Sequence, residues 1–397
     1  MMLSQRINRI QPSPTLAVSA RSKAMRAAGE DVLSFDVGEP DFDTPQHIKD
    51  ACIAALQSGD TKYTAAAGTP KFRQAISAKL ERENGLSYPP DDIVVSSGGK
   101  HSLFNIFQSI LNAGDEVLIP TPYWVSYPDQ VLLADGIPVF LPTTDADGFK
   151  ISPEQLEAAL GEHPRAKALV LNSPSNPTGA VYPPDHLRHL AEVLDKYPDV
   201  LVISDEIYEH MVYAPNEQWS IARFSPEFQK RCVLVQGLSK TYSMTGWRIG
   251  WTASTPELAK AMGKLQSQST SNPTSFAQAG GIAALEGPLP TAMLREFERR
   301  GEIMRELLSD VPGFQVRRSE GAFYLFPKVS DLFGIMVGKD RQINSATDLT
   351  NYLLEVALVA AVPGEGFGAP EHVRFSYANS LENIKRGVER ILGALPE

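Results

Sequence analysis

The segment from about residue 90 to residue 255 repeats one pattern, a short apolar run rich in β-branched residues followed by a helical pattern. The apolar runs show little alternation, as expected for strands that are covered on both faces. One intervening segment, "DHLRHLAEVLDKY", places its leucines on one helical stripe. Repetition of strand, helix and strand predicts an α/β fold with a mostly parallel seven-stranded sheet between helices. The predicted strands cover residues 92–97, 116–121, 137–143, 166–172, 199–204, 231–237 and 248–254.

A second, smaller α/β unit is predicted near the C-terminus. A chain of 397 residues exceeds what one simple core accommodates, and a long helical run at about 291–310 suits a hinge. We therefore predict a large domain over residues 46–290 and a small domain formed by residues 1–45 and 291–397, with an irregular, Pro- and Gly-rich N-terminal segment. The strands of the small domain are expected at 321–329, 357–362 and 372–378, and its last helix carries Ile384, Val388, Ile391 and Leu395 on one face.

The composition limits the classes of partner. The net charge is −10 and the pI is about 5.3, which argues against a surface for nucleic acid or an anionic membrane. The two cysteines, Cys52 and Cys232, cannot form a disulfide framework. No apolar run approaches the ~18 residues of a membrane span, and the N-terminus lacks the apolar core of a secretory signal. We expect a cytoplasmic protein without nucleic-acid or membrane partners.

Polar and aromatic residues gather where the predicted strands end. In open α/β sheets, ligands bind beyond the carboxyl ends of the strands, so we expect these residues to line one cleft. A glycine turn that opens a helix exposes backbone N–H groups to an anion. A loop lysine is usually solvated, and an aspartate after a strand is usually a helix cap, but neither explanation accounts for their convergence. The strand ends deliver "GGK" (98–100), "PYWVSY" (122–127), Asn176, Asp205 with Tyr208, and Lys240.

A planar aromatic aldehyde with a phosphate tail would use every member of this set. The glycine turn and Arg248 would hold the phosphate, and an aromatic side chain would stack on the ring. Asp205 would keep a pyridine nitrogen protonated, while Asn176 and Tyr208 would donate to a ring hydroxyl. Lys240 would bond to the aldehyde carbon and later move a proton between two carbons. The set therefore indicates pyridoxal 5'-phosphate as the cofactor.

Arg374 stands out within the predicted strand "HVRFSYA". Val373 and Phe375 are expected on one face of this strand, and Arg374 and Ser376 on the other. A charged residue in an otherwise apolar strand needs an anionic partner. The partner is either a carboxylate of the substrate or a salt bridge within the protein.

Taken together, the motifs of this chain resemble those of the class I/II aminotransferases, fold-type I enzymes that depend on pyridoxal phosphate. The resemblance covers essentially the whole chain and is strongest to the bacterial aspartate aminotransferase branch. No single motif is specific, but the combination is. The matching segments are "VGEPDFDTP", "YTAAAGTP", "SSGGKHSLFNIFQ", "PYWVSYP", "NSPSNPTGAVY", "SDEIYEH", "LSKTYSMTGWRIGW", "EGAFYLF", "AVPGEGFG" and "VRFSYA".

The resemblance implies a role for each matching residue. Lys240 corresponds to the catalytic lysine that binds the cofactor covalently, and Arg248 to the arginine that binds its phosphate. Asp205 matches the partner of the pyridine nitrogen, and Asn176 and Tyr208 match the donors to the ring hydroxyl. The other matches are Trp124 as the stacking aromatic, Gly99 and Lys100 in the phosphate site, and Gly38 and Arg374 as the groups that hold the α-carboxylate of the substrate, with Trp124 and Asn176 also near the substrate.

Two further expectations follow from the resemblance. Tyr63 matches a tyrosine that reaches the cofactor phosphate of a neighbouring subunit, which implies a homodimer with shared active sites. The Asn176–Pro177 bond is expected to be cis.

Lys100 bears on the choice of substrate. Similar enzymes of this branch use a lysine there for the distal carboxylate, and a cation buried near the phosphate would demand a second anion. We therefore predict transfer of the amino group from L-aspartate to 2-oxoglutarate. If Lys100 only supplements the phosphate site, the alternatives are a prephenate, aromatic or broad-specificity aminotransferase, or a pyridoxal-phosphate-dependent C–S lyase.

Two positions depart from the pattern of some relatives. Relatives that act on prephenate often carry a basic residue in the segment "RIQPSPT", where this chain has Gln11, with Arg9 nearby. This departure argues against prephenate as the substrate. Gly237 stands where some relatives have a serine that contacts the phosphate, so one hydrogen bond worth ~1 kcal/mol is expected to be missing.

Other classes of protein fit the sequence less well. A regulator that senses pyridoxal phosphate would carry an added DNA-binding module, for which the chain shows no spare segment or basic patch. A nicotinamide enzyme would need a spaced glycine motif that "GEGFG" (364–368) does not match. The seven histidines are scattered, so no metal site is predicted.

Overall fold

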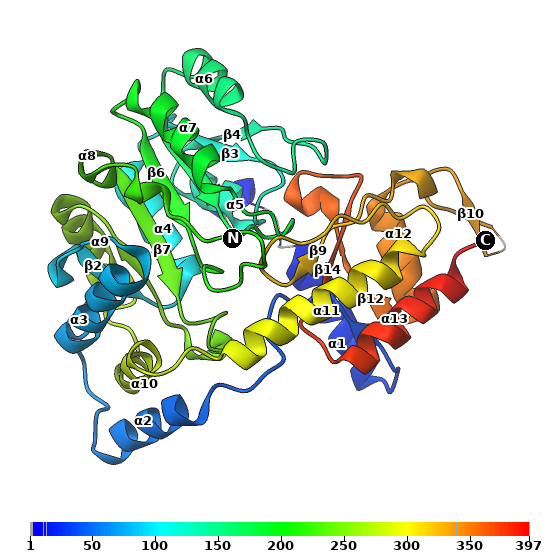
Figure 1. The fold of residues 1–397 in the computed structure, drawn as a ribbon, viewed down its shortest axis with the longest axis horizontal. Helices are drawn as coiled ribbons and strands as arrows, with labels where there is room; N and C mark the ends of the chain where they lie inside the picture. Colours follow the sequence, from blue (N-terminus) through cyan, green and yellow to red (C-terminus); the bar gives the residue numbers. More distant parts are fainter. Residues whose placement is uncertain (1–2, 11, 13, 339, 397) are drawn as a thin grey trace.

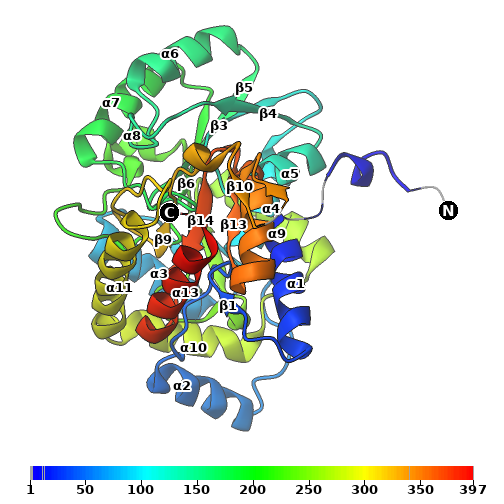
Figure 2. The same ribbon diagram turned by 90° about the vertical axis from the view of Figure 1, so that its right-hand side faces the viewer.

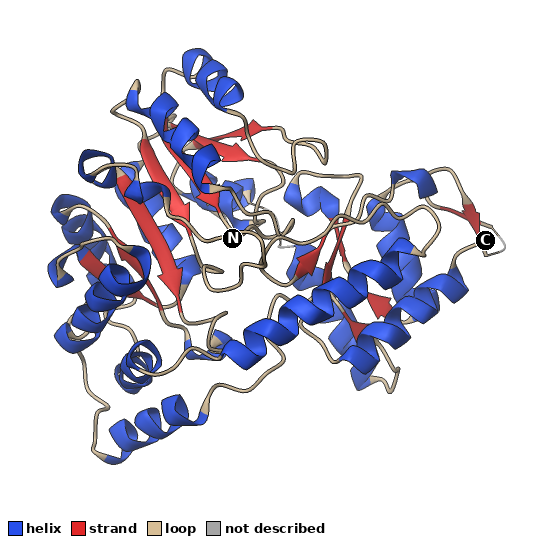
Figure 3. Cartoon of the chain, in the orientation of Figure 1, coloured by secondary structure: helices blue, strands red, loops and turns tan. Residues whose placement is uncertain are grey.

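The computed structural model describes residues 3–10, 12, 14–338 and 340–396, and this part of the chain forms two units (Figures 1 and 2). The larger unit contains a seven-stranded sheet with helices on both faces, and the smaller unit contains short sheets and the C-terminal helices (Figure 3). Helix α11 (Thr291–Ser309) runs from one unit to the other (Figure 1). The helix predicted at about 291–310 is therefore present, whereas its role as a hinge and the domain boundaries near residues 45 and 290 stay predictions.

The large sheet confirms the predicted α/β class. Its strand order is β2–β8–β7–β6–β5–β3–β4, and within it β8 alone runs antiparallel to its neighbours. All the predicted strands are present, with ends that move by no more than a few residues. They are β2 (Ile93–Ser96), β3 (Glu116–Pro120), β4 (Ile137–Leu141), β5 (Ala166–Asn172), β6 (Leu201–Asp205), β7 (Cys232–Gly237) and β8 (Gly250–Ala253).

The helices of the larger unit begin at signals that the sequence displays. Helix α3 (Pro70–Lys79) has proline at its first position and Thr69 before it, whose side chain accepts a hydrogen bond from the backbone N–H of Phe72. Both features are typical of helix N-termini. The stripe predicted on α7 (Pro184–Asp195) is buried. The other helices are α2 (Gln46–Gln57), α4 (Gly99–Ile110), α5 (Ser126–Leu133), α6 (Pro153–Glu162), α8 (Pro226–Gln229), α9 (Pro256–Ser269) and α10 (Ser275–Glu286).

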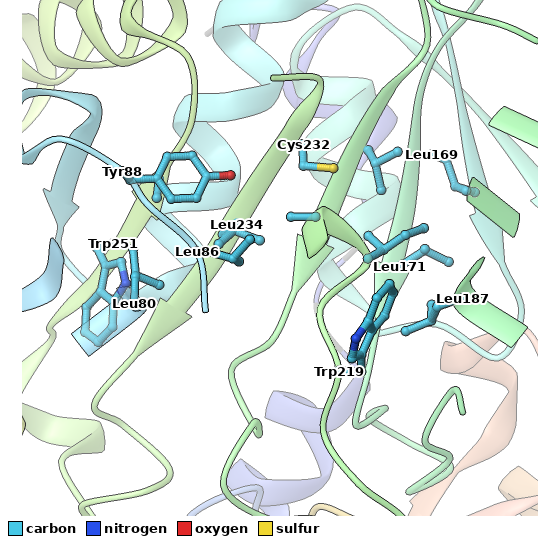
Figure 4. Close-up of a cluster of buried hydrophobic side chains, with 14 of the residues drawn as sticks. Leu80, Leu86, Tyr88, Leu169, Leu171, Leu187, Trp219, Cys232, Leu234 and Trp251 are labelled. Carbon is cyan, nitrogen blue, oxygen red and sulfur yellow. The ribbon is translucent and has the colours of Figure 1, made fainter. Parts of the chain in front are cut away.

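Alternate side chains of the central strands enter two separate cores. In β5, Leu169 and Leu171 pack on one face of the sheet, and Ala168 and Val170 on the other. Helices α3, α6, α7 and α10 cover the first face, and α4, α5 and α9 cover the second. Figure 4 shows the first core, where Leu171 lies near Trp219. Because both faces are covered, both sets of positions are apolar, which explains the runs without alternation.

The smaller unit differs in detail from its prediction. The run expected as one strand at 357–362 forms two, because its first half, β12 (Val359–Ala360), pairs with β1 (Leu33–Ser34), while β13 (Val362–Pro363) pairs with β14 (Val373–Ser376). The strand expected at 321–329 is reduced to β9 (Tyr324–Leu325), because Ala322 has a φ of 57° that interrupts an extended chain. The remaining elements are β10 (Met336–Val337), β11 (Arg341–Gln342), α12 (Ala346–Tyr352) and α13 (Leu381–Ala394), and α13 buries the predicted apolar face.

The expectation of an irregular N-terminal segment is wrong for residues 14–27, which form helix α1 (Pro14–Ala27). The segment after Pro14 is rich in alanine, lysine, arginine and methionine, which are good helix formers. Pro14 occupies the first helical position, where a missing N–H group removes no helical hydrogen bond. Gln11, which bears on prephenate, lies outside the described residues.

Within the described ranges, no helix has both the length and the apolar character that crossing a membrane requires. The same residues contain no group of three or more His, Cys, Asp or Glu side chains that could hold a metal ion.

Candidate active site

A cavity of about 300 Å³ lies where the two units meet, beyond the carboxyl ends of the parallel strands. Residues from β6, from the turn after β7, from α4 and from β14 line it. The structure thus brings together all the predicted site residues except Tyr63. Those that line the cavity are Gly38, Gly99, Lys100, Trp124, Asn176, Asp205, Tyr208, Lys240, Arg248 and Arg374.

Lys240 lines the cavity from the loop that follows β7. Its Nζ atom donates a hydrogen bond to the backbone carbonyl of Gly38 and lies 5.7 Å from the centre of the Tyr208 ring. Burial lowers the pKa of Lys240 to about 8, and the charges of Arg374 and Arg248 act in the same direction. A lysine with such a pKa carries an unprotonated, nucleophilic amine for a sizeable part of the time near neutral pH.

Asp205, the last residue of β6, is buried beside the cavity. Its Oδ2 atom accepts a hydrogen bond of 2.6 Å from the Tyr127 hydroxyl, and its Oδ1 atom accepts one of 3.2 Å from the backbone N–H of Ile207. Burial raises the pKa of Asp205 to about 6, whereas the hydrogen bond from Tyr127 and the charge of Lys240 oppose the rise. These donors favour the carboxylate form, which could hold a protonated ring nitrogen.

Asn176 is tied to the same strand end. Its backbone N–H donates to Asn172 Oδ1, and Asn172 Nδ2 donates to the backbone carbonyl of Asp205. The Asn176–Pro177 bond is cis, as predicted. The loop after β5 and the end of β6 are therefore linked across the sheet.

A phosphate-sized anion would find donors at the N-terminus of α4. Gly98 precedes the helix with a φ of 88°, and a Cβ atom at this position would collide with the guanidinium group of Arg248. Arg248 donates to the backbone carbonyls of Thr245 and Ser97, so its hydrogen-bond partners among the described residues are neutral. An uncompensated guanidinium group beside a helix N-terminus is a suitable site for a phosphate.

The structure supplies a steric reason for the unusual Gly237. A Cβ atom at this position would lie 3.0 Å from both Ile207 Cδ1 and the backbone oxygen of Ile249. These contacts disfavour a serine here, so the expected absence of one phosphate contact has a packing cause. Ser239 also lines the cavity and offers a hydroxyl group that the sequence analysis did not identify.

Arg374 is a buried cation without a carboxylate partner among the described residues. It is 2% exposed, and it donates to Asn176 Oδ1 at 2.9 Å and to the backbone carbonyl of Asp36 at 2.7 Å. Its Nε atom is buried and has no hydrogen-bond partner in the described part of the chain. The salt bridge considered as the alternative is therefore not seen, and the side chain is suited to binding a carboxylate.

The side chain of Lys100 is exposed, not buried as predicted. Its Nζ atom lies 4.9 Å from the centre of the Trp124 ring. Partial desolvation lowers the pKa of Lys100, and the nearby charge of Arg248 adds to this effect. The cavity therefore offers a second cation, distinct from Arg374, that is open to solvent and to a ligand.

Two tyrosines of the site, Tyr127 and Tyr324, have contacts that the sequence did not predict. The Tyr127 hydroxyl donates a hydrogen bond to Asp205, and the hydroxyl groups of Tyr324 and Tyr208 are joined by a hydrogen bond of 2.7 Å. Tyr324 also explains Gly38, because a Cβ atom there would lie 2.6 Å from the Tyr324 hydroxyl oxygen. Thr15 and Leu16 of α1 complete the cavity, and no sequence signal pointed to them.

Tyr63 does not line the cavity of its own chain. It lies in the loop between α2 and α3, and it is 89% exposed. Its predicted role toward a neighbouring subunit stays a prediction.

The cavity fits the predicted cofactor. Arg248 and the glycine turn match the phosphate, Asp205 matches the ring nitrogen, and the amine of Lys240 matches the aldehyde. Trp124 supplies an aromatic face next to Lys100. Each chemical feature of pyridoxal phosphate thus has a counterpart among the lining residues.

Comparisons with known proteins agree with this assignment. Residues 30–391 match the family model described as aminotransferase class I and II. An aspartate aminotransferase of Geobacillus stearothermophilus is 48% identical over 98% of both chains. An aspartate/prephenate aminotransferase of Nitrosomonas europaea is 46% identical over 100% of both chains.

Solved structures show the same similarity. The aspartate aminotransferase from Rhizobium meliloti superposes with a TM-score of 0.95 at 43% identity, covering 99% of this chain and 98% of that chain. The aspartate aminotransferase from Thermus thermophilus with maleate has a TM-score of 0.91 at 41% identity, with both chains fully covered.

We predict that Tyr127→Phe makes cofactor binding more sensitive to acid. The substitution removes a hydrogen bond to a charged group, worth ~1.5–3 kcal/mol, which corresponds to a rise of ~1–2 units in the pKa of Asp205. The raised pKa means that Asp205 becomes neutral at a higher pH as the solution is acidified, so affinity for pyridoxal phosphate is lost at a higher pH. The dissociation constant is measured by fluorescence titration between pH 5 and 9.

The matched control for this prediction is Tyr88→Phe, which removes a buried hydroxyl of a residue that does not line the cavity. It should leave the pH dependence unchanged. An identical pH midpoint in both variants would contradict the role assigned to Tyr127.

Proposed function

The chain belongs to the aminotransferase class I and II family, and on this basis we propose that it transfers the amino group of L-aspartate to 2-oxoglutarate, with pyridoxal 5'-phosphate as its cofactor. The observation that carries this proposal is the pair of cations, Arg374 and Lys100, that line one cavity with Lys240. Aspartate and 2-oxoglutarate each carry two carboxylates, so both would be held by the same pair. An amino acid with an apolar side chain would leave Lys100 without a partner.

The bound cofactor supplies an aldehyde that accepts the amino group and a conjugated ring that takes up negative charge. The chain contributes binding, orientation and proton transfer. Arg248 and the N-terminus of α4 would bind the phosphate, and Asp205 would keep the ring nitrogen protonated. Asn176 and Tyr208, which line the same cavity, would orient the ring hydroxyl.

Lys240 is the proton carrier in this proposal. With a pKa of about 8, its Nζ atom is available in both protonation states near neutral pH, so it would accept a proton from the α-carbon of the substrate, once that carbon is acidified by the bound cofactor, and return it elsewhere. Arg374 fixes the α-carboxylate, and so defines where the α-carbon lies relative to Nζ. The neutral partners of Arg374 leave its charge available to the substrate.

Prephenate is the second candidate substrate, because relatives similar over their whole length are named aspartate/prephenate aminotransferases. Prephenate also carries two carboxylates, so Lys100 alone does not discriminate against it. The sequence departure at Gln11 favours aspartate.

We further propose that two copies of the chain share their active sites. The observation that supports this is Tyr63, a large aromatic residue that is almost fully exposed in one chain. Exposed apolar side chains on α2, Ile53 and Leu56, lie near it in the sequence and extend the surface that a partner could cover.

The function is tested with purified protein loaded with pyridoxal phosphate. We expect an absorbance band near the visible edge and turnover of aspartate with 2-oxoglutarate that exceeds turnover of phenylalanine or cystathionine with 2-oxoglutarate, or of prephenate as the acceptor from aspartate. Lys240→Ala removes the amine that attaches the cofactor, so both the band and the turnover should be lost. A colourless parent protein, or one that does not use aspartate, would refute the proposal.

We predict that Lys100→Ala raises the Michaelis constant for aspartate by roughly tenfold or more, as expected when a charge-assisted hydrogen bond worth ~1.5–3 kcal/mol is lost. The constant for alanine should change less than twofold, because alanine has no distal carboxylate. Steady-state kinetics with both donors measure the difference. Equal effects on the two donors would mean that Lys100 serves the cofactor instead.

For the shared-site proposal, we expect sedimentation velocity to show a species of twice the 43.4 kDa chain mass. Tyr63→Ala should weaken binding of pyridoxal phosphate without altering any residue of the cavity in its own chain. A fully active monomer would be inconsistent with shared sites.

A further inference from the structure

Arg374 contacts, besides Tyr324, a continuous stack of rings. Its guanidinium carbon lies 5.1 Å from the centre of the Phe367 ring. Phe367 meets Phe326 edge to face at 6.0 Å, and Phe326 lies nearly parallel to the His372 ring, with centres 4.8 Å apart and planes at 9°. A chain of direct ring contacts thus runs from the cation of the substrate site to His372.

The stack ends at His372, whose imidazole ring lies beside the carboxylate group of Asp145. His372 is 7% exposed, and its Nε2 atom lies 2.8 Å from Asp145 Oδ2. Burial raises the pKa of Asp145, but the hydrogen bond from His372 and the charges of His372, Arg317 and Lys328 outweigh this and lower it. Asp145 is therefore an acceptor, and Nε2–H of His372 is the donor.

The contact joins the two units of the molecule. Asp145 and Phe149 belong to the loop between β4 and α6 of the large sheet, whereas Phe326, Phe367 and His372 surround β14. Phe149 meets both the Phe326 and His372 rings edge to face, at 5.9 and 5.5 Å. Phe149, Phe326 and Phe367, with Ala180 and Val362, form a small buried core of their own that bridges the units.

A backbone hydrogen bond also connects the stack to a loop that lines the cavity. The backbone carbonyl of Phe367 accepts a hydrogen bond of 3.0 Å from the backbone N–H of Tyr123, which precedes Trp124. The stack therefore connects Arg374, brought by the smaller unit, to the loop of the larger unit that carries the stacking face of the site. Of the residues assigned to the cofactor, Lys240 and Asp205 lie on the larger unit and make no described ring contact or hydrogen bond with these rings, whereas Asn176 accepts a hydrogen bond of 2.9 Å from Arg374 itself.

We propose that His372 and Asp145 are positioning residues for Arg374, which set the affinity of the enzyme for the α-carboxylate of every substrate without contacting it. This inference rests on the proposed function, because it takes Arg374 as the carboxylate-binding group. Two units joined at a cavity must be held in register for a group on one to act on a ligand bound to the other. His372 and Asp145 provide that register on the Arg374 side.

A purely structural contact would behave differently from a positioning one. Losing a structural contact lowers the stability of the whole chain and weakens every ligand in parallel. Losing a positioning contact raises the Michaelis constant for all substrates that share the α-carboxylate, while the cofactor, held by the larger unit, stays equally tight. The split between substrate and cofactor affinity is therefore the decisive measurement.

The experiment uses the holoenzyme with Asp145→Ala and, separately, His372→Phe, which keeps a ring on Phe326 but removes the donor. We expect the Michaelis constants for aspartate and for alanine to rise by the same factor of about ten, with kcat and the dissociation constant of pyridoxal phosphate within about twofold of the parent. Calorimetry should show a similar, roughly tenfold, weakening for succinate. Asp145→Asn, which retains an acceptor, should be intermediate.

Glu371→Gln is the matched control. It breaks an ion pair of 2.9 Å between Glu371 and Lys328, directly beside His372 in sequence but outside the ring stack, and should change none of these constants. Unchanged substrate constants in folded Asp145→Ala and His372→Phe would overturn the proposal, and so would a parallel loss of cofactor affinity. If the parent bound succinate but showed no transamination, the proposed function would fail while the succinate measurements would still decide the positioning role.

Discussion

Parallel pairing of β3, β5, β6 and β7 is the constraint on which the active site depends. Because these strands point the same way, the residues that follow them must emerge at one edge of the sheet. Four residues that are far apart in the sequence therefore line one cavity: Trp124, Asn176, Asp205 and Lys240. The two covered faces of the sheet hold the strands rigid, so the positions at the edge are well determined.

The electrostatics of the cavity oppose those of the chain as a whole. The protein has a net charge of −10, yet the cavity collects Lys100, Lys240, Arg248 and Arg374. The hydrogen-bond partners described for the two arginines are neutral amide and carbonyl oxygens, so their charges remain available to a ligand. Asp205 is the buried carboxylate among them, and desolvation shifts its pKa and that of Lys240 toward each other, to about 6 and about 8. Two groups poised on either side of neutrality suit a reaction that moves protons and accumulates charge on a ring.

The substrate side of the cavity depends on a different kind of contact. Arg374 belongs to a short strand of the smaller unit, and its position relative to Lys240 is determined by how the two units meet. Its guanidinium group lies within about 5 Å of the ring centres of Tyr324 and Phe367, and the stack through Phe326 and His372 ends on Asp145 of the larger unit. Lys240 and Asp205 are thus carried by the larger unit and Arg374 by the smaller one, and Asn176 links the two sides because it accepts a hydrogen bond from Arg374.

The sequence by itself determined the α/β class, the seven strands of the large sheet and most of the cavity. The reason is local: a covered strand must be apolar throughout, and polar residues at its end are visible against that background, as for Asp205 and Lys240. Only the tertiary structure decided the rest. The run at 357–362 has the composition of one strand, but its first half pairs with a strand near residue 33 and its second half with a strand near residue 373. The residues of the run do not by themselves specify these two pairings. The prolines near the start of helix α1 concealed its helical pattern in the sequence. The roles of Tyr127, Tyr324, His372 and Asp145 depend on contacts between segments that are tens or hundreds of residues apart. Such contacts depend on where a side chain lies in space, and one sequence records only its order along the chain.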